Sequence, residues 1–556
     1  MFSFMMSFTT WCSLSKRARA RAEQNCRAAR RSQMQATFLT HPALVAGLAM
    51  VAPSARTRLP ARTAAVTMAH ERTDIYCNRA INMESIQAIG FDMDYTLAEY
   101  YEDTFDLLAF DGAKAKLVTL GYPEEVANFK YDAKDYQRGL VLDKKRGNML
   151  KMDRHKYVKV AYHGLTPLTR DERQAIYASS FESQEQFIPP AFASVDTAFM
   201  LVDVSLFCQL VDYKDRHPDV LPQSYADLYK DVRHAVDLCH CDGVIKDQVA
   251  LEPAKYIKPS PELPRMLRQL RAGGKQVFIV TNSLFDFTNV VMKFLLGEGW
   301  TDHFDLVISG ARKPGFLLDS YLPLFLVRED NSLENVEIGS AFEPKTLLAQ
   351  SKVFQGGNWN HLHRLLGLTS GANLMYVGDH MYSDILRSKR TLGWRTVLII
   401  PELDHEVEQM EIAEERRRDY ETLRDSRAEM QKDLEIHSLR QLQLKIDGAE
   451  GDELDELQTQ TEALSAQIAE MNDELSASIQ DWHEDFHPVW GAMLKAGHQN
   501  SKWAQQVETY ACLYTSRVTN LAYTMPDTRF RVYSDMMPHD RYTFAAAEAA
   551  EDTASS

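Results

Sequence analysis

Two aspartates, Asp92 and Asp94, stand two positions apart directly after a short apolar run. Residues two apart in an extended segment project to the same side, so both carboxylates can face one substrate. Such a pair suits phosphoester cleavage through a covalent intermediate. One carboxylate attacks phosphorus, and the other protonates the leaving oxygen and then takes a proton from water. The pair alone is weak support, because loops and helix starts carry the same pattern routinely.

Three further polar elements follow in chain order. The triplet Thr281-Asn282-Ser283 offers a hydroxyl, an amide and main-chain N–H groups to a phosphate at a helix start. Lys313 offers an ammonium group that can neutralise phosphoryl oxygens. Asp379 and Asp384 add two acids of the kind that Mg²⁺ binds together with phosphate and water. Each element has an ordinary explanation as a helix cap or a solvated side chain, but their order and chemical complementarity favour one phosphate site.

Each of these elements follows a short apolar run rich in β-forming residues. The predicted strands are 86–91, 276–280, 305–308, 374–377 and 396–400. Continuous rather than alternating hydrophobicity is typical of parallel strands that are buried on both faces. Ligands of an open α/β sheet bind at the carboxyl ends of its strands, so we expect the four elements to meet there.

The segments around these strands predict separate domains. Between the first two strands the chain is too long for a loop, which indicates a cap domain inserted into the sheet domain. We predict a core at 80–107 and 247–403, a cap at 108–246, and a C-terminal helical region at 404–545 that completes the core. The last residues, 546–556, offer little to bury and are predicted to be disordered.

A charged stretch from 404 to about 480 predicts long helices. Its second half carries apolar residues at a three-four spacing, which is the pattern of a coiled-coil seam. The seam residues are Leu454, Leu457, Leu464, Ile468, Met471 and Leu475. A break at 447–451 favours an antiparallel helical hairpin. The hairpin is either an oligomer or partner contact, or a helix pair that packs on its own chain.

Composition excludes several classes of partner. The net charge of −16 argues against a nucleic-acid surface, because such surfaces need clustered Lys and Arg. No apolar run approaches the roughly 20 residues of a membrane-spanning helix. Seven cysteines without CxxC spacing fit a reducing compartment and no structural zinc.

The first 75 or so residues differ from the rest of the chain. They are rich in arginine and poor in acids, which is typical of a transit peptide for a plastid or mitochondrion. An apolar patch at 43–52 is also compatible with a short signal core. The alternative is a disordered extension of a cytoplasmic protein.

The residues of these motifs resemble those of the cytosolic purine 5′-nucleotidase family, which is a branch of the haloacid dehalogenase superfamily. The resemblance spans about residues 80–540. The matching segments are Phe91–Leu97, Ala311–Pro314, Gly378–His380 with Asp384–Leu386, Gly393–Thr396, Ile400–Leu403 and Met537–His539. It implies a Rossmann-like parallel sheet with an inserted cap and a Mg²⁺-dependent phosphoric monoester hydrolase that acts through an aspartyl phosphate.

The resemblance also assigns roles to residues. It implies Asp92 as the nucleophile and Asp94 as its acid/base partner. Thr281, Asn282 and Lys313 would bind the phosphate. Mg²⁺ would be held by Asp92, the main-chain carbonyl of Asp94 and Asp379, with Asp384 nearby or bound through water.

Cap residues match the positions that contact the nucleotide base in that family. Phe199 matches an aromatic that stacks on the purine, and the base-contacting positions are Arg233, Asp237, His240 and Lys246. The spacing of the first three of these puts them on one face of a helix. Met200 stands where the family has an asparagine, and Cys241 replaces a tyrosine. The segment before Thr197 does not follow the family's allosteric nucleotide site.

These features lead to one main hypothesis and two alternatives. The main hypothesis is a 5′-nucleotidase for purine nucleoside monophosphates of the IMP and GMP type. The first alternative is a phosphatase for another phosphorylated metabolite, motivated by Met200 and Cys241. The second is a non-catalytic scaffold that keeps the fold and uses the helical hairpin as its partner surface. A homo-oligomer formed through the C-terminal helices is compatible with each of them.

Overall fold

The computed structural model describes residues 73–177, 187–336, 343–448 and 451–532. Most of the predicted leader and all of the predicted tail lie outside these ranges. Within them, no helix combines the length and the apolar character that crossing a bilayer requires.

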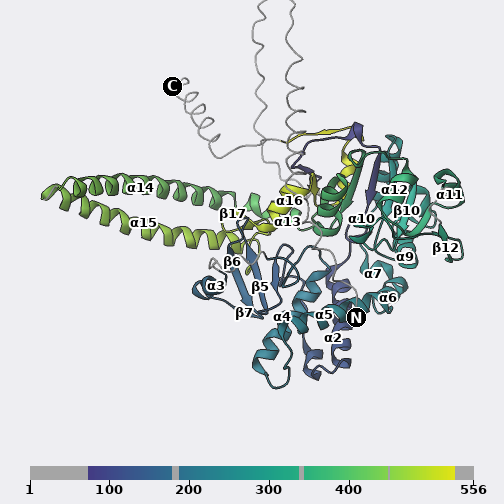
Figure 1. The fold of residues 1–556 in the computed structure, drawn as a ribbon, viewed down its shortest axis with the longest axis horizontal. Helices are drawn as coiled ribbons and strands as arrows, with labels where there is room; N and C mark the ends of the chain where they lie inside the picture. The colour runs from purple at the N-terminus through teal and green to yellow at the C-terminus, as the bar shows by residue number, and fades with distance from the viewer. Residues whose placement is uncertain (1–72, 178–186, 337–342, 449–450, 533–556) are drawn as a thin grey trace, which may run out of the picture. The chain divides into compact units, whose positions relative to one another are not determined.

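A ten-stranded mixed sheet forms the centre of the described chain (Figure 1). In sheet order its strands are β1 (Tyr76–Cys77), β18 (Leu513–Thr515), β15 (Arg395–Ile399), β14 (Leu374–Gly378), β3 (Ala88–Phe91), β9 (Gln276–Val280), β10 (Leu306–Ser309), β13 (Val353–Gly356), β11 (Leu324–Val327) and β12 (Leu333–Val336). The strands from β18 to β13 pair in parallel, and β1, β11 and β12 pair antiparallel at the two edges. The five predicted strands are therefore neighbours in the parallel part of the sheet.

The sheet is buried on both faces, which explains the continuous apolar runs. Ile89 of β3 and Val277 of β9 belong to one hydrophobic cluster. Ala88 and Phe278, their neighbours in sequence, belong to a second cluster. Alternate residues of each strand thus enter different cores, as expected for a sheet with elements packed on both sides. Helices of the sheet domain are α6 (Lys246–Leu251), α7 (Pro253–Tyr256), α8 (Leu263–Ala272), α9 (Phe285–Leu296), α10 (Gly315–Leu318), α11 (Pro344–Gln350) and α12 (Trp359–Leu366).

The central strand β3 depends on a glycine for its packing. A Cβ at Gly90 would overlap the ring of Phe278 and lie 2.9 Å from the ring of Tyr376. A side chain at this position would displace both aromatic rings, and core packing leaves little room for such shifts. Gly90 therefore leaves the space beside β3 that the rings of Phe278 and Tyr376 fill.

The inserted segment between β3 and β9 contains both helices and a second sheet. Its helices are α2 (Glu102–Thr119), α3 (Arg170–Tyr177), α4 (Met200–Arg216) and α5 (Tyr225–Cys241). Its antiparallel sheet has the order β7 (Thr166–Pro167), β6 (Val158–His163), β5 (Asn148–Met152), β4 (Val141–Asp143) and β8 (Phe192–Ser194). Sequence reasoning expected helices here and missed this sheet. Helix α2 also runs across the boundary predicted at 107/108.

The C-terminal region contributes both to the sheet and to a helical hairpin. Strand β18 lies between β15 and β1, so the chain returns to the sheet after the hairpin. The helices are α13 (Leu403–Ile412), α14 (Glu414–Ile446), α15 (Asp452–Glu484) and α16 (Lys502–Tyr510). Two small ladders pair β16 (Lys495–Ala496) with β17 (Gln499–Asn500), and β19 (Arg529–Phe530) with β2 (Ile81–Asn82). The described fold confirms the predicted α/β class with an inserted cap and a C-terminal helical hairpin.

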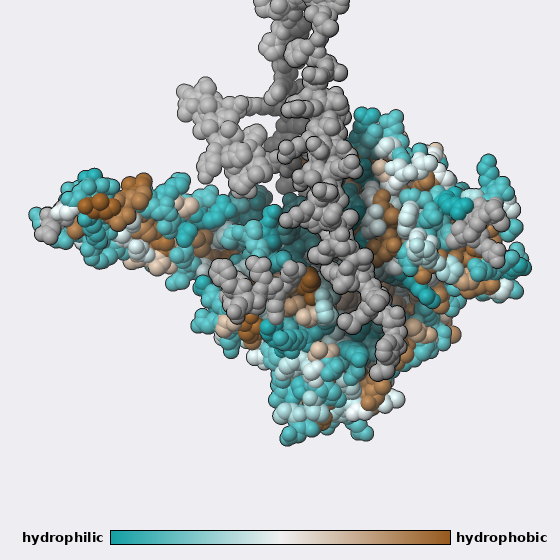
Figure 2. All heavy atoms as spheres, in the orientation of Figure 1, coloured by the Kyte–Doolittle hydropathy of each residue, from teal (hydrophilic) through white to brown (hydrophobic). Residues whose placement is uncertain are grey.

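Helices α14 and α15 lie side by side (Figure 1). The predicted seam residues of α15 are all partly or fully buried, while most of their neighbours are exposed. The opposite, outer side of α14 carries an apolar stripe, visible as a brown patch near the end of the hairpin (Figure 2). Its residues are Ile436, Leu439, Leu442 and Ile446, each more than half exposed. Coiled-coil geometry and a homo-oligomer through these helices both remain predictions.

One buried ion pair connects the cap to the sheet domain. Arg138, which precedes β4, is 1% exposed and makes two hydrogen bonds to the carboxylate of Glu402, at 2.8 and 2.6 Å. Arg138 also donates to the main-chain oxygens of Asp379 and Ile399. Its guanidinium therefore has acceptors on several sides, which is what a buried cation needs.

We expect Arg138→Met to lower the free energy of unfolding by about 3 kcal/mol, because it leaves the Glu402 carboxylate without its cation. Arg418→Met is the matched control, since Arg418 pairs with Glu414 at 2.6 Å but both side chains are more than half exposed. That control should cost less than about 1 kcal/mol. Urea unfolding of both variants measures the difference, and equal losses would contradict the assigned role of Arg138.

Candidate active site

The four predicted elements meet at the carboxyl ends of adjacent parallel strands. Asp92 follows β3, Thr281 follows β9, Lys313 lies in the loop after β10, and Asp379 follows β14. The sheet order β14-β3-β9-β10 places these strand ends next to one another. The predicted convergence is therefore observed.

The ammonium group of Lys313 lies between two carboxylates. Its Nζ is 2.9 Å from Oδ2 of Asp92 and 2.8 Å from Oδ1 of Asp384. It also donates to the hydroxyl of Tyr376 at 3.0 Å, and that hydroxyl donates to the carbonyl of Val280. Burial alone would lower the pKa of Lys313, but Asp384 and Asp92 raise it well above its ordinary value. Lys313 is therefore a fixed positive charge at neutral pH.

Three acids form a group beside this lysine. Carboxylate oxygens of Asp92, Asp379 and Asp384 lie within 4.8 Å of one another, and all three residues are largely buried. Burial, followed by the charges of Asp384 and Asp92, raises the pKa of Asp379 well above its ordinary value. One lysine cannot balance three carboxylates, so the group fits a hard divalent cation that takes oxygen ligands.

Asp384 can approach this group because of a neighbouring glycine. It lies in a π-helical segment, η5 (Met381–Leu386), and Oδ2 accepts a hydrogen bond from the N–H of His380 at 3.2 Å. A Cβ at Gly378 would lie 2.5 Å from Oδ2 of Asp384. Glycine at this strand end thus leaves the space that the carboxylate fills. Such π-helical turns recur at functional sites.

Two hydroxyl groups hold the carboxylate of Asp94 in place. Tyr100 donates to Oδ1 at 2.5 Å, and Ser283 donates to Oδ2 at 2.7 Å. Burial raises the pKa of Asp94 to about 6 despite the hydrogen bond from Tyr100. The pKa of Asp92 also rises to about 6, first through burial and against the effect of Lys313. A carboxyl group with a pKa near 6 can give and take a proton near neutral pH.

The triplet after β9 organises the loop that carries Lys313. Asn282 accepts a hydrogen bond from the N–H of Lys313 at 2.5 Å and donates to its carbonyl at 3.2 Å. Thr281 accepts from the N–H of Ser283 at 3.1 Å. The side chain of Asn282 therefore holds the main chain of Lys313 in place, and the contacts of Thr281 and Asn282 with a phosphate stay predictions.

Sequence reasoning missed several residues that hold the site together. Tyr376 was treated only as part of a strand, although its hydroxyl contacts Lys313. Thr197 of the cap donates to Oδ2 of Asp379 at 2.9 Å, and Arg138 donates to the carbonyl of the same residue at 3.1 Å. Arg138 lies 241 residues before Asp379 in a segment without a motif, so no local signal pointed to it.

The predicted base-binding residues lie near one another in the cap. Arg233 of α5 pairs with Asp203 at 2.7 Å and with Asp237 at 2.5 Å. The rings of His240 and Phe199 meet edge to face, 5.5 Å apart. Burial, and then the charge of Arg233, lowers the pKa of His240 to about 4. A neutral imidazole can accept as well as donate a hydrogen bond, which suits contact with a base edge.

Lys246 and Phe199 connect this cluster to the catalytic elements. Lys246 is the first residue of α6, and its charge contributes to the lowered pKa of His240. Phe199 packs edge to face against Tyr95, which follows Asp94 in sequence, with ring centroids 4.7 Å apart. Phe199 thus joins the predicted base-binding residue His240 to the segment that carries Asp94.

A family model described as the 5′ nucleotidase family matches residues 75–542. The chain belongs to the 5′ nucleotidase family. This membership confirms the family to which the motifs pointed and agrees with a phosphoric monoester hydrolase. The matched range includes the sheet domain, the cap and the hairpin.

Known relatives of this family carry the same domain. The chain is 34% identical to 5′-nucleotidase domain-containing protein 2 of Rattus norvegicus over 60% of each chain. It is 28% identical to a 5′-nucleotidase domain-containing protein of Dictyostelium discoideum, over 84% of this chain and 75% of that protein. The match thus spans 60% of the length of the rat relative, which is less than two thirds.

Solved phosphatase structures are more distant. One is a predicted phosphoglycolate phosphatase from Haemophilus somnus, with 12% identity and a TM-score of 0.25, covering 57% of this chain and 85% of that one. A score this low supports no conclusion by itself. Family membership therefore rests on the sequence match.

The raised pKa of Asp94 predicts a pH effect on stability without metal. The pKa of Asp94 is about 6 in the folded chain, whereas its ordinary value, which we take for the unfolded chain, is 3.8. The folded chain therefore binds this proton more tightly than the unfolded chain does. The free energy of unfolding should therefore fall as pH rises through this interval. We expect that fall to be up to about 3 kcal/mol smaller in Asp94→Asn. Urea unfolding in EDTA across this range measures it, and parallel curves would contradict the shift.

Proposed function

We propose that this protein is a Mg²⁺-dependent 5′-nucleotidase that hydrolyses purine nucleoside monophosphates through a phosphorylated aspartate. The observation that carries the proposal is the position of Lys313 between Asp92 and Asp384, with Asp379 beside them. A lysine and three buried acids at one sheet edge have charges that match a phosphoryl group and one divalent cation.

Asp92 is the proposed nucleophile. Its Oδ2 accepts from Lys313 and its Oδ1 accepts from the N–H of Met93 at 2.8 Å, so the carboxylate is held in one orientation. In the first step a carboxylate oxygen of Asp92 forms a bond to phosphorus while the bond from phosphorus to the nucleoside oxygen breaks. Lys313 neutralises charge on the phosphoryl oxygens during this transfer.

Asp94 is the proposed acid and base. When protonated it donates its proton to the leaving nucleoside oxygen. The resulting carboxylate then takes a proton from a water whose oxygen bonds to phosphorus, while the bond from phosphorus to Asp92 breaks and inorganic phosphate is released. The hydroxyls of Tyr100 and Ser283 fix its orientation. Its pKa of about 6 supports both steps near neutral pH.

Mg²⁺ fits the acids of the site. Carboxylates of Asp92, Asp379 and Asp384, with the main-chain carbonyl of Asp94, offer the hard oxygen donors that this ion prefers. When bound, the ion would offset the negative charge that a phosphate brings to these acids. Thr197 and Arg138 hold Asp379 in place for this role.

The cap cluster supports a purine as the leaving nucleoside. Phe199 offers a ring for stacking, and Arg233, Asp237 and His240 offer donors and acceptors on one helix. Met200 begins α4 directly after Phe199 and brings a thioether instead of an amide. A different phosphorylated metabolite is therefore the alternative that substrate profiling must address. Import into an organelle and a homo-oligomer remain proposals as well.

Substitution of the nucleophile should abolish turnover. We expect Asp92→Asn to reduce Mg²⁺-dependent phosphatase activity by about a thousandfold or more, and to leave no acid-stable phosphoprotein after incubation with labelled substrate. Asp473→Asn, an exposed position on α15, is the matched control and should retain full activity. A wild type no more active than Asp92→Asn on every substrate tried would exclude the enzyme and favour the scaffold alternative.

Base recognition by the cap predicts a selective effect on KM. Purified protein should hydrolyse IMP and GMP faster than pyrimidine monophosphates or sugar phosphates. Asp237→Asn should raise KM for IMP roughly tenfold with a smaller change in kcat, because the contact is present before and during reaction. Asp219→Asn, exposed in the same cap, is the control. No preference for purine monophosphates would contradict the purine assignment while leaving the phosphatase intact.

A further inference from the structure

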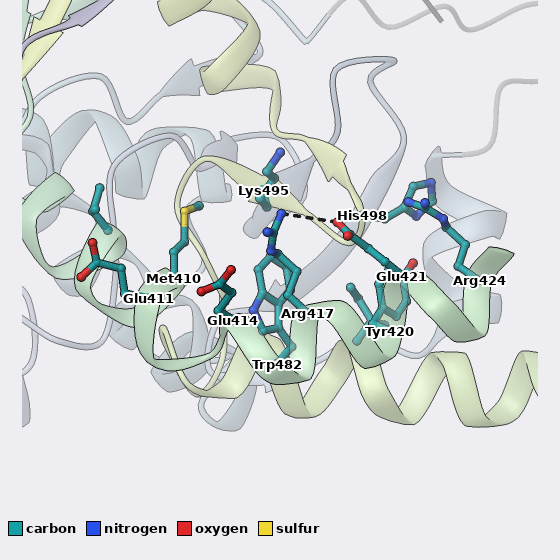
Figure 3. Close-up of a pocket in the computed structure, with 12 residues that line it drawn as sticks. Met410, Glu411, Glu414, Arg417, Tyr420, Glu421, Arg424, Trp482, Lys495 and His498 are labelled. Atoms are coloured by element: carbon teal, nitrogen blue, oxygen red, sulfur yellow. Dashed lines mark hydrogen bonds and ion pairs between the residues drawn. The ribbon is translucent and has the colours of Figure 1, made fainter. Parts of the chain in front are cut away.

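A cavity lies at the base of the helical hairpin (Figure 3). None of the residues that line it belongs to the group of acids around Lys313. We call it the hairpin-base pocket. Its walls come from α13, the first turns of α14, the last turns of α15, and the segment of β16 and β17. Its volume of about 460 Å³ is within the range of small-molecule sites.

The inner part of the pocket is apolar and aromatic. Val407, Met410 and Ile479 supply aliphatic side chains, and Tyr420 and Trp482 supply rings. Trp482 is 7% exposed, and its indole N–H has no hydrogen-bond partner among the residues that the structure describes. The ring of Trp482 therefore contributes aromatic surface to the wall of the pocket.

The rim of the pocket carries cations. Arg417, Arg424 and Lys495 line it, and Figure 3 shows their side chains in the same view as Trp482. Burial and the charges of Arg417 and Arg154 lower the pKa of Lys495, although Glu406 acts in the opposite direction. Burial and the charges of Lys159 and Arg424 likewise lower the pKa of His498. Burial is the main cause of both shifts, and an anionic group beside Lys495 would favour its charged form.

Three acids, Glu411, Glu414 and Glu421, line the pocket together with its three cations, so the partner of each cation decides where an anion could bind. Arg424 pairs with Asp425 at 2.8 Å. Glu421 pairs with Arg417 at 3.4 Å, and Glu414 pairs with Arg418, which lies outside the pocket, at 2.6 Å. Lys495 donates to the amide oxygen of Asn500 at 2.7 Å, which is a neutral partner. The ammonium of Lys495 is thus the charge best placed to take an anionic group.

The pocket also shares a helix with the catalytic site. Val407 and Met410 lie on α13, and Glu402 at the N-terminal cap of α13 pairs with Arg138, which contacts the carbonyl of Asp379. Glu406 of the same helix accepts hydrogen bonds from the N–H groups of Met493 and Leu494, directly before Lys495. A ligand that shifts α13 would therefore act on both ends of this chain of contacts.

We propose that the hairpin-base pocket binds a small aromatic anion, and that α13 couples its occupancy to the metal-binding acids. The flat ring lies among Tyr420, Trp482 and the aliphatic side chains, and the anionic group lies at Lys495. The first half is independent of catalysis. The coupling rests on the proposed metal site, so it is tested through Mg²⁺ binding and not through turnover.

The binding test uses the full chain and the aromatic sulfonate 8-anilinonaphthalene-1-sulfonate, whose fluorescence rises in an apolar site. We expect saturable binding that excess IMP does not displace. Lys495→Gln, which keeps a donor for Asn500, should weaken it roughly tenfold, because a charge-assisted contact is lost. Trp482→Phe should weaken it severalfold.

Two controls separate the pocket from other surfaces. Leu439→Ser removes part of the exposed apolar stripe of α14, and Arg440→Gln removes a cation near the far end of the hairpin. Neither should change the affinity. Equal affinity in the wild type, Lys495→Gln and Trp482→Phe, or a loss in the Leu439→Ser control, would overturn the site.

The coupling test repeats the titration with and without saturating Mg²⁺. We expect the dissociation constant of the sulfonate to change at least twofold, and calorimetry should find the same factor in Mg²⁺ affinity, because coupling is reciprocal. Asp379→Asn should abolish the Mg²⁺ effect and keep sulfonate binding. Unchanged affinity with Mg²⁺ bound would overturn the coupling but not the pocket. Inactivity of the wild type would refute the proposed function. The sulfonate-binding test and the Mg²⁺-coupling test could still be interpreted, because neither measures turnover.

Discussion

The described structure depends on one buried charge balance. Lys313 supplies a single positive charge to a group of carboxylates that are largely removed from water. Burying three acids beside one lysine costs free energy, and that cost is characteristic of sites whose remaining charge is completed by a ligand. The excess of carboxylates over cations in this group fits the divalent cation that we propose for it.

The sheet provides the rigidity that this balance requires. Asp92, Lys313 and Asp379 each follow a strand whose neighbours are fixed by parallel hydrogen-bond ladders, so their main chains cannot move apart without breaking the core. Two glycines, Gly90 and Gly378, leave the space that neighbouring side chains need around these strands. One admits the Tyr376 ring against β3, and the other leaves space for the Asp384 carboxylate. Because Tyr376 and Asp384 both contact Lys313, the two glycines are needed for the geometry of the site as well as for packing.

The sequence was sufficient to predict what local patterns and motifs encode. The five central strands are short but continuous apolar runs, and the acids and the lysine follow them in recognisable motifs, so the α/β class and the convergence were predictable. The cap sheet was not, because β4 and β8 are only three residues long and their pairing partners are distant in sequence. Arg138 and Thr197 were missed for a similar reason. Their partners are set by tertiary packing, and nothing in their neighbourhood marks them.

The cap and the acids are physically linked, which has a consequence for how specificity and chemistry are combined. Thr197 and Arg138 belong to the inserted segment, yet both donate hydrogen bonds to Asp379 of the sheet domain. Phe199, two residues after Thr197, packs against Tyr95, which directly follows Asp94. A displacement of the cap would therefore disturb Asp379 and the ring contact of Phe199 together. Met200 directly follows Phe199 and makes none of the contacts to Asp379 described above, so under the proposed function a change at this position could alter substrate choice without altering the hydrogen bonds that hold Asp379.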